Sequence, residues 1–210
     1  MSKIKQGILG AGSGKVGGVI MSSWKGIATL RSMPASVDNP NTSAQQSQRS
    51  KFTQAVACAR LLLAELIHPF WDPFMKGMSG YNAFIQKNID CFDATGLKTP
   101  EDFVASRGVL VGISNFSANL DAGSLEVSYF WDNNSGVGDA LATDLLVAVI
   151  YNETQKKWFV STSTWKRQDK ACAFTILGVV STDILHAYGF FRRPDISKIS
   201  DSSHSAVPLA

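Results

Sequence analysis

The clearest helical pattern in the chain runs from Ser43 to about Ile67. No glycine or proline interrupts this segment, and Phe52, Val56, Leu63 and Ile67 recur at the spacing of one helix face. The first turns are polar and basic and the last turns are apolar, and the His-Pro pair that follows is expected to end the helix. A helix of this length would span about 37 Å. The aromatic-rich segment after it predicts two short helices, broken at residues 77–80.

After residue 98 the pattern changes to that of β-strands. Short runs of β-branched and aromatic residues are separated by Gly, Asn, Asp or charged turns, and no segment offers a helical crossover between them. The predicted strands are 109–116, 124–131, 144–151, 157–164, 171–177 and 184–191, with a seventh within 198–209. Six or seven strands in about 110 residues predict an antiparallel β-sandwich of the immunoglobulin or fibronectin type.

The N-terminal segment predicts a β-hairpin arm. Six glycines precede Val19, and two β-prone runs, 19–24 and 27–32, flank Lys25–Gly26, where a tight turn is expected. A polar loop at 34–43 then leads to the helix. The predicted fold class is therefore α+β: a glycine-rich hairpin arm, one long helix and short helices, followed by the β-sandwich. We place the domains at 1–98 and 99–210.

Charge is distributed unevenly along the chain. Residues 1–60 hold eight Lys or Arg and one acidic residue, whereas residues from 101 onward hold nine basic and twelve acidic ones. A basic segment can bind an acidic partner or neutralise phosphates, although dispersed cations are also typical of a solvated face. Trp24 adds an aromatic ring that could stack on a base or a sugar. The candidate interaction residues are Lys3, Lys5, Lys15, Trp24, Lys25, Arg31, Arg49 and Lys51.

The sequence offers no convincing catalytic motif. Gly12-x-Gly14-x-x-Gly17 has the dinucleotide-binding spacing, but a β-prone stretch follows it where that motif requires a helix. His68, His186 and His204 lack metal-ligand spacing, and no nucleophile elbow is present. We therefore predict no catalytic residues, no metal and no cofactor, and a protein that is not an enzyme.

Three widely spaced cysteines fit neither a disulfide framework nor a metal knuckle, so we expect buried, reduced thiols. No apolar run is long enough to span a membrane, and the glycine-rich N-terminus with its scattered lysines is unlike a signal peptide. The predicted location is a virion or the cytoplasm.

Several stretches together carry a family resemblance: GKVGG, SSWKGIATLRSMP, NPNTSAQQSQRSKF and MSGYNAFIQKNI in the first half, and ATDLLVAVIYN, HAYGFF and SDSSHS in the second. This combination resembles an uncharacterised family from Bacteroidota genomes and their phages or prophages, in which an N-terminal motif precedes a C-terminal β-domain. The resemblance covers most of the chain and carries over no catalytic residues. Similar short patterns in phage structural-region proteins suggest a role in particle assembly.

From these features we expect a non-enzymatic structural or assembly subunit of a phage or phage-derived particle. Its partners would be further copies of the chain or other particle subunits. Two alternatives stay open: a nucleic-acid-binding protein that uses the basic N-terminal segment, and a carbohydrate-binding or adhesive β-sandwich module.

Overall fold

The computed structural model describes residues 2–3, 13–24, 27–36, 39–162 and 164–210. The chain forms two compact units, Met1–Thr42 and Ser43–Ala210. Within the described residues the fold is α+β, with three α-helices and three antiparallel sheets, so the predicted class is confirmed at this level. The predicted boundary at 98/99 lies inside the second unit and stays a prediction about independent folding.

The first unit is a four-stranded antiparallel sheet in the order β1-β4-β3-β2, which we call the N-terminal sheet. Its strands are β1 (Ser2–Lys3), β2 (Gly14–Val16), β3 (Val19–Trp24) and β4 (Ile27–Ser32). Strands β3 and β4 pair from Val19–Ser32 to Trp24–Ile27, which confirms the predicted hairpin on both sides of its turn. Residues 17 and 18 join β2 to β3, and Gly17 takes a φ of 57°, a conformation that glycine adopts without strain.

A layer of helices opens the second unit. It contains α1 (Ser43–Leu61), α2 (His68–Phe70) and α3 (Gly80–Asn88), with short 3₁₀ turns at Asp72–Phe74, Ile89–Cys91 and Pro100–Asp102. A π turn, Leu63–Ile67, joins α1 to α2, because the amides of Leu66 and Ile67 both donate to the carbonyl of Leu62. The long helix predicted to about Ile67 is thus confirmed in its extent, but helical structure continues through the His-Pro pair to Phe70. Proline is tolerated there because it lies in the first turn of α2.

The remaining strands form two sheets. A four-stranded sheet has the order β11-β10-β7-β8 and a three-stranded sheet has the order β5-β6-β9. The strands are β5 (Ser114–Leu120), β6 (Glu126–Asp132), β7 (Leu145–Asn152), β8 (Lys157–Ser161), β9 (Ala171–Thr175), β10 (Leu185–Arg192) and β11 (Ser203–Val207). Five of these, β6 to β10, start within two residues of the predicted starts, and β11 lies within the predicted range 198–209. The first was placed about five residues too early, because Leu110 forms only an isolated bridge to Ser200 and the ladder with β6 begins at Ser114.

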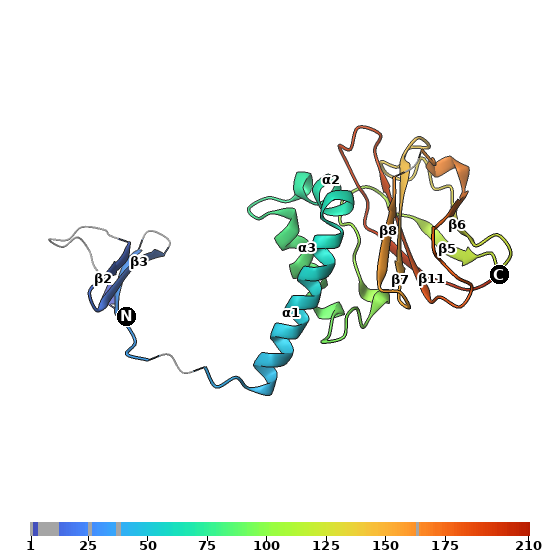
Figure 1. The fold of residues 1–210 in the computed structure, drawn as a ribbon. Coiled ribbons are helices and arrows are strands. Elements are labelled where there is room, and N and C mark those ends of the chain that lie inside the picture. The colour runs from blue at the N-terminus through green and yellow to red at the C-terminus, as the bar shows by residue number, and fades with distance from the viewer. Residues whose placement is uncertain (1, 4–12, 25–26, 37–38, 163) are drawn as a thin grey trace. The chain divides into compact units, whose positions relative to one another are not determined.

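The four-stranded sheet is covered on both faces, as Figure 1 shows for the helices and for β5 and β6. Val147, Val149 and Phe190 point to a core shared with the helices. Leu146, Ala148 and Phe191 point to a second core shared with the three-stranded sheet. Because alternate residues of β7 and β10 enter different cores, both strands are almost continuously buried.

Candidate functional site

The N-terminal sheet places two of the predicted basic residues on one face. Lys15 lies opposite Ile20, and Ile20 lies opposite Arg31, so the three side chains form one row across β2, β3 and β4. Lys15 and Arg31 are exposed. The same face continues with Ser22 and Thr29, whose hydroxyl oxygens are 2.8 Å apart. This polar and basic surface, which we call the basic face, is the part of the predicted interaction site that the structure assembles.

Two other predicted residues take register positions on the same side of the sheet, and the rest lie elsewhere. Lys3 on β1 is opposite Thr29, and Trp24 ends β3 two residues after Ser22. Arg49 and Lys51 belong to α1, in the other compact unit. Two further candidates, Lys5 and Lys25, lie outside the described residues.

The opposite side of the N-terminal sheet is mainly apolar, although the register also places Ser23 and Ser32 on it. Val16 lies opposite Val19, and Met21 lies opposite Leu30, and Ala28 follows two residues before Leu30 on the same side. We call these five residues the apolar face. None of them is buried, and Val16 is 64% exposed. Among residues 13–23, 27–36 and 39–42, where the structure describes burial, none is buried, so this part of the sheet has no core of its own.

A buried ionic cluster lies in the second unit. The Asp144 carboxylate accepts from Arg167 Nη2 at 3.1 Å and Arg193 Nη1 at 2.6 Å, and from the Leu141 amide at 2.9 Å. The side chains of Asp144 and Arg167 are fully buried. Burial lowers the pKa of Arg167, and the neighbouring carboxylate of Asp144 opposes that shift. The three charged side chains of this cluster pair with one another, so we assign the cluster a role in stabilising the fold.

Two histidines that the sequence treated separately lie side by side. His186 on β10 and His204 on β11 have Nδ1 and Nε2 3.1 Å apart, and Glu153 Oε2 lies 3.2 Å from the other ring nitrogen of His186. Burial lowers the pKa of His204, the nearby His186 lowers it further, and Glu101 acts in the opposite direction. The sequence spacing of 18 residues gave no sign of this pair, because antiparallel pairing with an irregular connection between the strands creates it.

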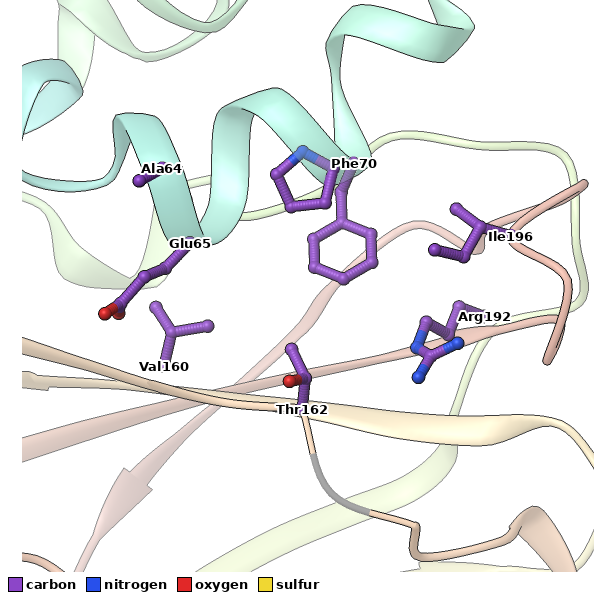
Figure 2. A pocket seen from close by; sticks show the side chains of 8 residues that line it. Ala64, Glu65, Phe70, Val160, Thr162, Arg192 and Ile196 are labelled. Atoms are coloured by element: carbon purple, nitrogen blue, oxygen red, sulfur yellow. The ribbon is translucent and has the colours of Figure 1, made fainter.

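A pocket of about 380 Å³ lies between the helical layer and the four-stranded sheet. Glu65 from the π turn and Phe70 from α2 line one side, and Val160, Thr162, Arg192 and Ile196 line the other (Figure 2). We call it the π-turn pocket. π turns inside helices are frequently found at functional sites. Sequence reasoning missed this pocket, since its residues come from segments up to 132 positions apart.

The described cysteines and acidic residues do not form a metal centre. Within the described residues no group of three His, Cys, Asp or Glu side chains could hold a metal ion. Cys58, Cys91 and Cys172 are buried and free of disulfides, and burial raises the pKa of all three thiols, that of Cys172 to about 12. None of the described helices is both long and apolar enough to cross a membrane.

Fold and surfaces together define an α+β protein in which a small amphipathic sheet precedes a helix-covered β-unit. The chain belongs to a family of unknown function, DUF6266, whose model matches residues 10–205. Membership of an uncharacterised family, predicted from the sequence motifs, is thereby confirmed. No curated protein matches the chain.

Proposed function

We propose that the protein is a non-enzymatic assembly subunit, whose N-terminal sheet docks by its apolar face onto a second copy of the chain. The observation that supports this most directly is that none of the five side chains of that face is buried: Val16 is exposed and the other four are half-buried. Burying a Val, Leu or Met side chain contributes about 1.5–3 kcal/mol. Burying the five residues of the apolar face by docking would therefore stabilise the assembly by several kcal/mol relative to the solvated sheet.

Charge favours a second copy as the partner. The first 60 residues carry seven more positive than negative charges, and the chain from residue 101 onward carries three more negative than positive ones. Complementary potentials of this kind steer association and select the partner. A phage or phage-derived particle is the setting that the sequence resemblance suggests for such an assembly.

We also propose that the second unit contains a sandwich of immunoglobulin or fibronectin type. Named in chain order, with β8 as C′, the strands give one sheet of A-B-E and another of G-F-C-C′, the division typical of this architecture. The core that Leu146, Ala148 and Phe191 share with Val127 and Tyr129 of the three-stranded sheet supports the proposal.

A matched pair of variants tests the assembly role. Leu30→Glu adds a charge to the apolar face, and Thr29→Glu adds the same charge one residue away, on the basic face. Light scattering coupled to size-exclusion chromatography at 500 mM salt would measure the mass of each. We expect wild type and Thr29→Glu to assemble and Leu30→Glu to be monomeric, with the same melting temperature of the second unit. Equal masses for all three proteins would refute docking through the apolar face.

The basic face supports one competing function, nucleic-acid binding. Lys15 and Arg31 share a face, and each phosphate contact would release counterions. Retention on DNA that falls steeply between 50 and 200 mM salt, and that Arg31→Gln reduces while assembly persists, would favour this alternative. Retention that Arg31→Gln leaves unchanged would count against it.

A further inference from the structure

The three buried or half-buried arginines near the end of β10 differ in their partners. Arg167 and Arg193 both bind the carboxylate of Asp144. Arg192 has no carboxylate within ion-pair distance among the described residues. Its Nη1 donates only to the carbonyls of Arg193 and Pro194, each at 3.3 Å. Its Nε is buried and finds no acceptor in the described part of the chain.

The positive charge of the Arg192 guanidinium therefore has no carboxylate partner among the described residues, and the group lies beside a cavity. Burial lowers the pKa of Arg192, and no neighbouring acid opposes the shift. A buried polar donor without an acceptor is uncommon in folded proteins and is destabilising. Arg192 also lines the π-turn pocket, and Figure 2 shows its guanidinium on the side away from Glu65.

Polar and apolar groups contribute about equally to the pocket wall, and the apolar part lies on both sides of the pocket. Phe70 is held in place by an edge-to-face contact with Phe190, with ring centroids 5.1 Å apart, and Val160 and Ile196 complete the apolar part. Thr162 adds one hydroxyl. The volume of about 380 Å³ lies within the range of small-molecule sites. A ligand that matches the wall therefore carries an apolar body together with one group that accepts hydrogen bonds from a guanidinium.

Glu65 narrows the choice of anion. Its carboxylate lines the same pocket on the other side, so a doubly charged phosphate entering there would meet more repulsion than a singly charged group. A carboxylate also matches the planar geometry of the guanidinium.

We propose that the π-turn pocket binds a small monocarboxylate, with the carboxylate on Arg192 and the carbon chain against Phe70, Val160 and Ile196. This binding site lies wholly in the second unit and does not depend on the proposed assembly role.

Titration calorimetry on the full-length protein with acetate, butyrate, hexanoate and inorganic phosphate tests the proposal. We expect affinity to rise from acetate to hexanoate, because each methylene buries apolar surface, and phosphate to bind more weakly than hexanoate. Equal affinity along the series, or tighter binding of phosphate, would overturn the assignment of a carboxylate with an apolar body.

Variants locate the binding site. Arg192→Gln should weaken hexanoate binding by about tenfold or more, since it removes the charge-assisted hydrogen bonds. Arg192→Lys keeps the positive charge and should retain part of the affinity. It serves as a second variant in case Arg192→Gln fails to fold. Glu65→Gln should tighten binding, and Arg60→Gln, an exposed arginine of α1, should leave it unchanged. Hexanoate binding that survives both Arg192 variants undiminished would refute the site.

Discussion

Asp144→Asn tests how strongly the buried ionic cluster stabilises the second unit. The substitution keeps the shape of the side chain but removes the one negative charge that Arg167 and Arg193 share, at distances of 3.1 and 2.6 Å. Because Arg167 is fully buried, its charge would be left without compensation. Removing one member of a buried pair costs about 3–5 kcal/mol, and about 2–4 °C of melting temperature per kcal/mol applies to a chain of this size. We therefore expect the melting temperature to fall by about 10 °C or more.

Urea denaturation at pH 7, followed by tryptophan fluorescence, would measure this loss, with circular dichroism to follow thermal unfolding. Asp139→Asn is the matched control, because Asp139 forms a half-exposed pair with Lys198 at 2.8 Å and its removal should change little. A loss of less than about 1 kcal/mol for Asp144→Asn would show that water or relaxation compensates the arginines, and would refute the reasoning.

Three further predictions concern the second unit. Because the helices and the four-stranded sheet share one core, residues 43–210 should unfold in a single transition. A fragment of residues 99–210 lacks the helices and should bind a hydrophobic dye through the uncovered face of the sheet. Cooperative unfolding of that fragment would instead favour the domain boundary predicted from the sequence. The three thiols should react slowly with a thiol reagent until urea unfolds the chain, and fast labelling of two of them would contradict their burial. The lowered pKa of His204 means that the unfolded chain binds its proton more readily, so stability should fall as pH drops below about 6.5. The loss in unfolding free energy from pH 8 to pH 5 should be smaller in His204→Phe, and an equal loss would exclude this histidine as a cause.

Local patterns were sufficient to predict most elements of secondary structure. The hairpin at 19–32 followed from two β-prone runs around one glycine, and α1 followed from a long stretch free of glycine and proline. The π turn was missed, because it differs from an α-helix only in that an amide donates its hydrogen bond to the fifth preceding carbonyl as well as, or instead of, the fourth. Such a change does not alter the hydrophobic pattern. The start of β5 was misplaced because Leu110 forms only an isolated bridge to Ser200, and alternation alone does not reveal where the ladder with β6 begins.

Sites were harder to predict than elements, since they depend on which strands become neighbours. The shared face of Lys15 and Arg31 requires the register of three strands, although their excess of charge was visible in the sequence. Arg192 carries no signal of its own in the sequence, because it follows an apolar strand in the same way as Arg193. Only the position of Asp144, which lies within reach of one arginine and not the other, distinguishes the two.

The covering of the four-stranded sheet by helices decides where another molecule can reach the second unit. Two packed sheets without a further layer can each present an outer surface for recognition, but here Val147, Val149 and Phe190 are buried beneath the helical layer. Recognition by this unit therefore cannot use that face of the sheet, and it is left to the outer surface of the helices, the edge strands, the outward side of β5, β6 and β9, and openings between helix and strand. The π-turn pocket is such an opening, and a smaller one of about 90 Å³ lies between α1 and the same sheet.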